Sequence, residues 1–225
     1  MDNRRHMWYN ILMYYILEVF RMKLVTVCAQ SFGANTYLFI SGNEAMIVDP
    51  AISVSAILEA IRAEDAFPVG ILLTHGHFDH IISLDTLRNG SSIDAYIHKD
   101  DAIMLTDGKK NAFFEFFGKE RVYRPAERLL SDGDTIKLGN EEITVIHTPG
   151  HTLGSVCYRS GNILVTGDTL FAESFGRCDL WGGSIENMGM SLKRLRSLPK
   201  DTIIYPGHGA SSRLDHALDN VAYLM

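Results

Sequence analysis

From Met22 onward, short apolar runs bounded by turn residues alternate with amphipathic stretches. Strands are predicted for KLVTVCA, NTYLFIS, EAMIVDP, VGILLT and IDAYIH, and later for DTIKLG, EEITVIHT, SVCYRS, NILVTG and DTIIYP. Helical spacing predicts helices in VSAILEAIRAE with Ser53 as N-cap, in IISLDTLRN ending at Gly90, in IENMGMSLKRLRSL and in the C-terminal tail. Strand groups followed by helices in both halves predict two sheets with helices packed outside them.

The domain is expected to comprise residues 22–225, because no linker or low-complexity tract divides them. Residues 1–21 form an extension, basic and then apolar, that superficially resembles a signal peptide. Asn10 and Glu18 interrupt its apolar stretch, no small-residue cleavage site follows, and a membrane span needs roughly 20 apolar residues. We therefore expect an amphipathic extension without stable membrane insertion, with Met22 as an alternative translation start.

A segment of different character, residues 99–128, contains the run FFEFF around Glu115. Two interpretations stay open at this point. The phenylalanine rings fill the core beneath a surface excursion, or they form a lid or pocket wall that contacts substrate beside an active site.

Composition narrows the class of protein. The chain has 225 residues, 46% of them hydrophobic, and a net charge of −6, so it lacks the basic excess that nucleic-acid binding requires. Three cysteines, Cys28, Cys157 and Cys178, lie far apart and form no Cys-x-x-Cys pair. This sparse, odd set favours a reducing cytoplasm over a disulfide scaffold.

One pattern with chemical meaning recurs four times: a predicted strand ends in a glycine-containing turn that presents metal-ligand side chains. Active-site residues commonly lie on such loops, at the ends of strands in a rigid sheet. If the strand ends are aligned, the side chains converge on one rim. They are His75, His77, Asp79, His80, His151, Asp168 and His208.

Imidazole nitrogens and carboxylate oxygens are ligands of borderline cations such as zinc. Seven ligands exceed the needs of one tetrahedral ion, so two metals about 3.5–4 Å apart are implied. We assign His75, His77 and His151 to the first metal, Asp79, His80 and His208 to the second, and Asp168 to both as a bridge. Gly76 is expected to relieve crowding between the first two histidines through unusual dihedral angles.

Other histidines compete for these roles. His98 ends a predicted strand and His147 precedes His151 by four residues; both are interpreted as supporting or structural residues. His6 and His216 lie in helical contexts near the chain ends and are interpreted as surface residues.

Taken together, THGHFDH, TPGHT, TGDTLF and PGHG resemble the metallo-β-lactamase-fold hydrolases, over nearly all of residues 22–225. The stretch TGDTLFAESFGRCDLWGGS is similar to that of the hydroxyacylglutathione hydrolases (glyoxalase II). The resemblance implies an α+β fold, a four-layer αββα sandwich, and the two-metal assignment above, with Asp79 and Asp168 as catalytic residues. It also implies that Asp49 orients a ligand histidine.

The chain departs from glyoxalase II after His208, where ASSRLDHALDNVAYLM is too short for the C-terminal region that binds glutathione in that family. The hydrolytic motifs are nevertheless complete. Recognition of the glutathione moiety is therefore left open.

The expected reaction is hydrolysis of a small-molecule thioester of the hydroxyacyl-glutathione type. Two divalent ions, zinc by preference with iron or manganese as alternatives, lower the pKa of a shared water, and the bridging hydroxide attacks the carbonyl carbon. A thiolate, whose parent pKa is near 8.5, leaves without a strong general acid. The oligomeric state is left open.

Other activities use the same scaffold. Persulfide dioxygenases resemble this sequence too, and a lone iron would use His75, His151 and Asp168. A lactonase would use the same water. A β-lactamase is disfavoured by the absence of a convincing export signal, and a nuclease by the negative charge. A metal-binding sensor or interaction module without turnover is disfavoured by the complete ligand set.

Two features follow Asp168. Cys178 is read either as a metal ligand or redox switch, or as a packed small residue. Arg177 and Asp179 are expected to form an ion pair that holds this loop.

Overall fold

The computed structural model describes residues 22–27 and 33–225. The extension of residues 1–21 and Cys28 lie outside the described residues, so the predictions made for them stay predictions. Within the described part, no helix is both long enough and apolar enough to cross a membrane.

The first half of the chain forms a six-stranded sheet in the order β1-β2-β3-β4-β5-β6. β1 to β3 are antiparallel, whereas β3 to β6 run parallel to one another. The strands are β1 (Lys23–Val27), β2 (Thr36–Ser41), β3 (Glu44–Val48), β4 (Phe67–Leu72), β5 (Asp94–His98) and β6 (Arg128–Leu130).

The second half forms a sheet in the order β12-β11-β10-β9-β8-β7. β10 and β11 are parallel, and the other neighbours are antiparallel, so β8, β10 and β11 all point the same way. The strands are β7 (Thr135–Leu138), β8 (Glu141–His147), β9 (Val156–Ser160), β10 (Ile163–Gly167), β11 (Ile203–Pro206) and β12 (Ser212–Arg213).

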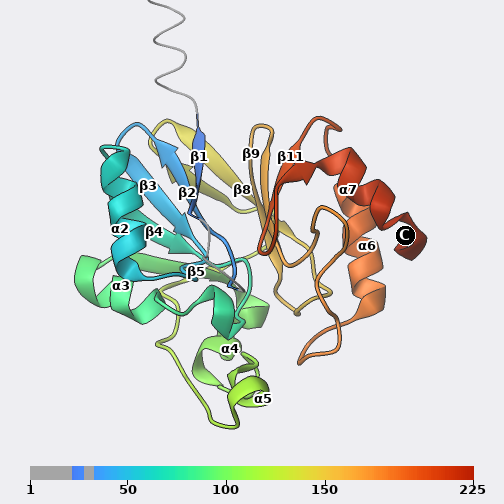
Figure 1. Cartoon of the computed structure of the whole chain (residues 1–225), viewed down its shortest axis with the longest axis horizontal. Helices are drawn as coiled ribbons and strands as arrows, with labels where there is room; N and C mark the ends of the chain where they lie inside the picture. Colours follow the sequence, from blue (N-terminus) through green and yellow to red (C-terminus); the bar gives the residue numbers. More distant parts are fainter. Residues whose placement is uncertain (1–21, 28–32) are drawn as a thin grey trace, which may run out of the picture.

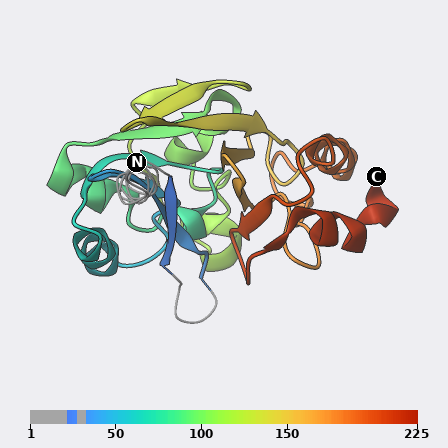
Figure 2. The ribbon, with the colours of Figure 1, turned by 90° about the horizontal axis from the view of Figure 1, so that it is seen from above.

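Helices cover the outer face of each sheet (Figures 1 and 2). On the first sheet they are α2 (Val54–Ala63) and α3 (Leu84–Ser91), and on the second α6 (Ile185–Leu195) and α7 (Leu214–Asn220). Three short 3-10 turns are also present: η1 (Phe78–His80), η2 (Lys99–Asp101) and, after α7, η3 (Ala222–Leu224). The predicted N-cap is confirmed, because Ser53 Oγ accepts a hydrogen bond from the Ala56 N–H at 3.4 Å.

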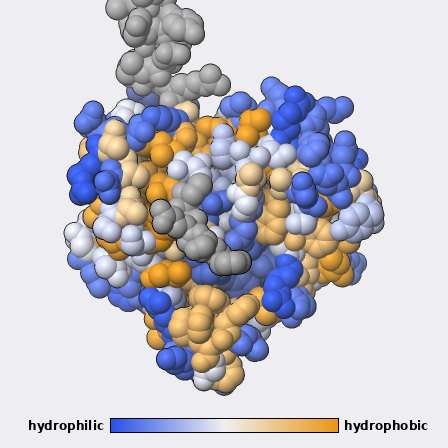
Figure 3. Space-filling model, viewed as in Figure 1, coloured by the Kyte–Doolittle hydropathy of each residue, from blue (hydrophilic) through white to orange (hydrophobic). Residues whose placement is uncertain are grey.

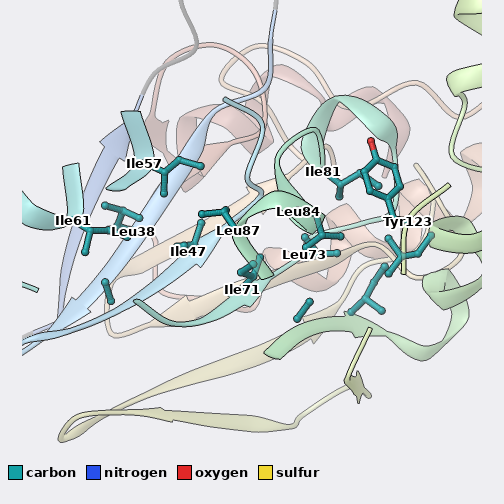
Figure 4. Packing of buried hydrophobic residues seen from close by; sticks show 14 of the residues in the cluster. Leu38, Ile47, Ile57, Ile61, Ile71, Leu73, Ile81, Leu84, Leu87 and Tyr123 are labelled. Carbon is teal, nitrogen blue, oxygen red and sulfur yellow. The ribbon is translucent and has the colours of Figure 1, made fainter. Parts of the chain in front are cut away.

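Three apolar clusters separate the four layers. Along β2, Leu38 and Ile40 face the helices, where they meet Ile57 of α2 (Figure 4). The alternate residues Tyr37 and Phe39 face the other sheet, because successive side chains of a strand point to opposite faces. A third cluster lies beneath α6 and α7. The predicted four-layer αββα sandwich is therefore confirmed.

The connection between β5 and β6 is a surface excursion that carries α4 (Ala102–Thr106) and α5 (Phe113–Phe117) (Figure 1). Phe116 and Phe117 are 57% and 54% exposed. The interpretation that these rings fill the core is therefore wrong.

The end of α3 also differs from the prediction. The helix passes through Gly90 and ends at Ser91, and Ser92 then takes the left-handed conformation with φ of 52°. Gly90 has open space around it and keeps the helical conformation, and the left-handed residue that ends the helix is Ser92 instead.

Candidate metal centre

The site lies where the carboxyl ends of strands from both sheets meet. In the first sheet, Asp49 follows β3 and the THGHFDH loop follows β4. In the second, His151 follows β8, Asp168 follows β10 and His208 follows β11. Parallel strands place their carboxyl ends at one edge, so residues far apart in sequence converge there.

Three histidines form the first group. His151 Nε2 lies 2.8 Å from His77 Nδ1 and 3.2 Å from His75 Nε2. All three rings are buried, and they meet edge to face. Three ring nitrogens thus point into one small space.

A second group lies beside the first. His208 Nε2 is 3.4 Å from Asp79 Oδ2, and His80 Nε2 is 3.9 Å from the same oxygen. Asp168 lies between the groups: its Oδ1 is 3.3 Å from His80 Nε2, and its Oδ2 is 3.5 Å from His151 Nε2. The seven side chains singled out in the sequence are therefore brought together.

These spacings match those of a ligand shell. Two nitrogens that bind one tetrahedral zinc at about 2.1 Å lie about 3.4 Å apart. All but one of the donor pairs described above are separated by 2.8 to 3.5 Å, and His208 Nε2 lies 3.6 Å from Asp168 Oδ2. The donor arrangement fits bound cations without rearrangement of the backbone.

Hydrogen-bond partners on the far side of the His151 and His80 rings determine which nitrogen of each ring is free to bind metal. His151 Nδ1 donates to the Arg177 carbonyl oxygen at 2.6 Å, so its Nε2 carries the lone pair. His80 Nδ1 donates to Asp49 Oδ2 at 2.8 Å, which leaves His80 Nε2 as the acceptor. The hydrogen bonds select the metal-binding tautomers.

Asp49 also connects to the first group through Thr74. Thr74 Oγ1 donates to Asp49 Oδ2 at 2.6 Å, and the Thr74 N–H donates to Asp49 Oδ1 at 2.8 Å. Since that hydroxyl proton is used, Thr74 Oγ1 accepts from His75 Nδ1 at 3.1 Å, and His75 Nε2 remains free. One buried carboxylate therefore orients two of the histidines.

Electrostatics divide the donors into two kinds. Burial lowers the pKa of His75 well below its usual value, with His80 and His151 adding to the effect. Burial and the neighbouring His151 lower the pKa of His77 to about 3. Burial also lowers the pKa of His151. These rings are neutral at pH 7, the form that binds metal.

The carboxylates are held ionised. Burial alone would raise the pKa of Asp79, but His80 and His208 outweigh it and lower the value to about 2. Burial alone would also raise the pKa of Asp168. The attraction of His80, His151 and His208 outweighs burial and holds the pKa of Asp168 well below its usual range. Burial would lower the pKa of His80, yet Asp168, Asp79 and Asp49 raise it well above its ordinary value. The cluster of carboxylates thus favours a positive charge at its centre.

Several atoms of the cluster lack a protein partner. His80 Nε2 and Asp168 Oδ1 are buried without a hydrogen bond, which is costly for polar atoms unless a ligand completes them. A Cβ atom on Gly207 would lie 2.2 Å from Asp168 Oδ1 and 2.6 Å from His80 Cε1. Glycine at this position keeps the space beside both donors open.

A cleft of about 640 Å³ opens onto the cluster, a volume within the range of small-molecule sites. Its wall includes Phe78, from the ligand loop itself, and Phe116 of α5. It also includes Arg177, whose guanidinium forms two hydrogen bonds with Asp179 at 2.6 and 2.7 Å. The predicted ion pair of this loop is confirmed.

The family model described as the metallo-beta-lactamase superfamily matches residues 30–208. The chain belongs to the metallo-beta-lactamase superfamily. The resemblance inferred from the four motifs is confirmed at this level.

Two curated relatives illustrate its place in the superfamily. The chain is 35% identical over 179 residues to the protein named "Probable metallo-hydrolase YqgX" from Bacillus subtilis, with 78% of this chain and 85% of that protein covered. It is 33% identical over 201 residues to a hydroxyacylglutathione hydrolase from Salmonella typhi, with 85% of this chain but 66% of that protein covered.

Solved structures of the superfamily share the architecture. The B3 metallo-beta-lactamase BLEG-1 matches with a TM-score of 0.83 and 32% identity, covering 90% of this chain and 99% of that one. TTHA1623, in a di-iron-bound form, matches with a TM-score of 0.75 and 30% identity, and the match covers 85% of this chain and 96% of that one. ETHE1 from Myxococcus xanthus matches with a TM-score of 0.72 and 25% identity, and the match covers 86% of this chain and 80% of that one.

Asp101 is a buried residue beside the metal centre that was not singled out from the sequence. Its Oδ2 accepts hydrogen bonds from the Gly76 N–H at 3.2 Å and from Thr152 Oγ1 at 2.7 Å, and its Oδ1 accepts from the Gly154 N–H at 2.7 Å. Burial raises the pKa of Asp101 to about 6, although these three donors favour the carboxylate. Asp101 joins the loop of His75 and His77 to the loop of His151.

Gly76 has a different role from the one expected. Its φ lies outside the left-handed region, and an added Cβ would lie 2.5 Å from Met104 Cβ. The glycine therefore allows α4 to pack closely against the ligand loop, and the explanation by crowding between histidines is wrong.

Asn35 supports the His208 turn and was also not singled out from the sequence. Its Nδ2 donates to the carbonyl oxygens of Pro206 and Gly209, both at 3.0 Å, and Tyr37 Oη donates to the Pro206 oxygen at 2.7 Å. Residues of the first sheet thus hold a ligand turn of the second.

The rival histidines form a pair of their own. His98 and His147 stack face to face, with ring centroids 4.0 Å apart and an interplanar angle of 13°. His98, Asp100 and His147 have donor atoms within 4.8 Å of one another. An ion shared by stacked rings would lie outside both ring planes, where the nitrogen lone pairs do not point, so we interpret this pair as structural.

Cys178 is half-buried, and its Sγ donates to the Gly176 carbonyl oxygen at 3.4 Å. It packs against the apolar cluster beneath α6 and α7. This environment favours the interpretation as a packed small residue.

Proposed function

We propose that the protein is a dinuclear metal-dependent hydrolase that cleaves a small thioester. The observation that carries this proposal is the convergence of seven donors, in which the buried His80 Nε2 and Asp168 Oδ1 lie 3.3 Å apart and neither has a hydrogen bond. His75, His77 and His151 would hold one cation, and Asp79, His80 and His208 the other, with Asp168 shared. Zinc fits this donor set best, with iron and manganese as alternatives.

Divalent cations at such a site supply Lewis acidity and lower the pKa of bound water towards neutrality. The chain itself orients the donors: Asp49 and Arg177 fix the ring tautomers of His80 and His151. Asp79 has a side chain that is 30% exposed, and its lowered pKa keeps it ionised at neutral pH, so its carboxylate is available as a ligand to the second cation. In the net reaction a C–O bond forms, the C–S bond breaks, and water supplies both the oxygen and the proton.

A thioester suits the cleft because a thiolate leaves without a strong acid, whereas an amide needs a proton donor for its amine. The similarity to the Salmonella typhi hydroxyacylglutathione hydrolase supports the same reaction class. The chain covers 66% of the length of that protein. We therefore leave the thiol moiety unspecified.

The test is metal analysis of purified protein together with a thioester-hydrolysis assay, with and without a chelator. Two equivalents of metal and hydrolysis that stops on chelation and returns on zinc addition are expected. One equivalent of iron combined with oxygen uptake from a persulfide, and no thioester hydrolysis, would replace the proposal with its runner-up.

That runner-up is a mononuclear-iron, persulfide dioxygenase-like enzyme, favoured by the distances of His151 Nε2 to His75 Nε2 and to Asp168 Oδ2. It leaves His80 Nε2 without a metal or a hydrogen bond, which is why the dinuclear proposal is preferred. A lactonase would use the same machinery, and a lactone in the assay distinguishes it.

A further inference from the structure

The wall of the cleft beside the metal centre is aromatic on one side. The ring of Phe78 lies 5.5 Å from Phe113, 5.5 Å from Phe116 and 5.4 Å from Phe117, measured between ring centroids. Phe78 itself stands between the ligands His77 and Asp79 in the chain. The aromatic cluster therefore begins at the metal ligands and extends outward along α5.

This cluster is exposed to a degree that folding alone does not explain. Phe116 is 57% exposed, Phe117 is 54% exposed, and Ile82 on the same wall is 39% exposed. Figure 3 shows hydrophobic side chains gathered over α5, at the lower end of the molecule. Exposed apolar surface that adjoins a reactive site marks a binding surface.

Charged side chains also line the cleft and the hollow that adjoins it. Arg177 lines the cleft and is paired with Asp179, and the adjoining hollow contains Lys109 and Lys110. Lys110 lies 3.5 Å from Asp107, and its ammonium lies 5.0 Å from the centroid of the Trp181 ring. The polar side offers cations that already have carboxylate partners, rather than a built site for a polyanion.

The apolar and the charged parts of this lining match the two halves of a thioester. A departing thiolate carries negative charge, and charge placed against apolar rings is costly, so the thiol half is expected near Arg177 of the lining rather than against the rings. The acyl substituent stays uncharged throughout the reaction and gains from contact with phenyl rings.

We propose, on the basis of the thioesterase function proposed above, that the substrate carries an apolar acyl group of several carbons or an aromatic ring, which packs against Phe78 and Phe116. Phe116 is then a specificity-determining residue for this enzyme. The acyl group extends from the metal centre along α5 towards solvent.

The kinetic test uses the zinc-loaded enzyme and N-acetylcysteamine thioesters of constant leaving group: acetyl, butanoyl, hexanoyl and phenylacetyl. We expect kcat/KM to rise about two- to fourfold per added methylene, the value for burying a CH₂ group. Phe116→Ala should flatten this rise, with a loss of roughly tenfold for hexanoyl and less than about twofold for acetyl.

Phe114→Ala is the matched control. Phe114 lies on the same helix and is 38% exposed, but its ring packs near the Lys109 ammonium, 5.6 Å from the centroid. This variant should keep the wild-type dependence on chain length. Equal kcat/KM for all acyl groups in the wild type, or the same loss in both variants, would overturn the proposal.

A binding measurement separates this proposal from the proposed function. Alkyl hydroxamates bind metal through their oxygens and direct the alkyl group to the acyl side, so titration calorimetry with acetohydroxamate and hexanohydroxamate probes the wall without turnover. Tighter binding of the longer compound, lost in Phe116→Ala, supports the acyl surface even if no thioester is hydrolysed. Equal affinities, or a Phe116→Ala variant that changes a dimer into a monomer while affinities stay unchanged, would contradict it.

Discussion

Asp49 Oδ2 and His80 Nδ1 lie 2.8 Å apart in a fully buried pair, so the carboxylate determines which nitrogen of His80 faces the metal centre. Asp49 has a left-handed backbone with φ of 49°, a conformation that Asn also tolerates. Substitution by Asn therefore keeps the shape of the site while reversing one hydrogen bond.

For Asp49→Asn we expect metal binding about 10- to 100-fold weaker, because the amide N–H₂ requires His80 Nδ1 to accept and so protonates Nε2. Competition with a chromophoric chelator measures this change. A variant that binds two metals with wild-type affinity would show that the pair does not select the tautomer.

Asp168→Ala should lose the second metal and, with it, activity by a factor on the order of a thousand, since the shared carboxylate is removed from both donor groups. Metal stoichiometry and thioester hydrolysis are measured on the same preparation. Glu173→Gln, an exposed carboxylate in the same loop, serves as control. A fully active Asp168→Ala variant with two metals would refute the bridging role.

Gly207→Ala should weaken metal binding without unfolding the chain. The added methyl group would lie 2.2 Å from Asp168 Oδ1 and occupy the space beside the donors. Gly90→Ala is the matched control: nothing lies within 4 Å of its Cβ, and alanine within a helix should stabilise by about 0.5 to 1 kcal/mol. Metal titration and thermal melting of both variants test the contrast, and equal metal affinity in the two would disprove it.

Asp101→Ala should lower the free energy of unfolding by about 3 kcal/mol, since it leaves two backbone N–H groups and the Thr152 hydroxyl without their buried acceptor. Asp101→Asn, which keeps one acceptor oxygen, should lose less. Urea unfolding of the metal-free variants gives the difference. If Asp101→Ala is as stable as the wild type, the two ligand loops are held by other contacts.

Acid should destabilise the protein through His98. Burial, with the adjacent His147, lowers the pKa of His98 to about 4, whereas the unfolded chain titrates near 6.5. Between these values the unfolded state binds more protons, so stability falls as pH falls through this window. The loss attributable to His98 from pH 7 to pH 4.5 is about 2 kcal/mol.

His98→Asn keeps an acceptor for the Asp100 N–H, which His98 Nδ1 accepts at 3.3 Å, but has no titrating ring. Its unfolding free energy, measured with chelator present, should depend less on pH in this window than that of the wild type. An unchanged dependence would assign the acid sensitivity to other groups.

Several features of the site follow from local sequence. His75, His77, Asp79 and His80 share one loop, and strand ends that meet at one edge bring His208 to them, so the convergence is predictable. Asp101 was not predictable: Asp100 beside it has the same chemistry, and the direction of the η2 turn decides which carboxylate is buried.

Non-local packing explains the other differences. Gly76 is required by Met104, 28 positions further along the chain, and no local pattern identifies that contact. The FFEFF run has the composition of a core segment. Its rings are exposed because the surface excursion that carries the run lies outside the core.

The donors come from both sheets, and the first and last of them are separated by more than half of the polypeptide. A ribosome-bound chain that has not yet released His208 lacks a complete ion shell, so loading of the full pair of cations must follow synthesis. Once bound, the ions would cross-link the two halves of the sandwich. Their removal should therefore weaken the contact between the halves before either half unfolds.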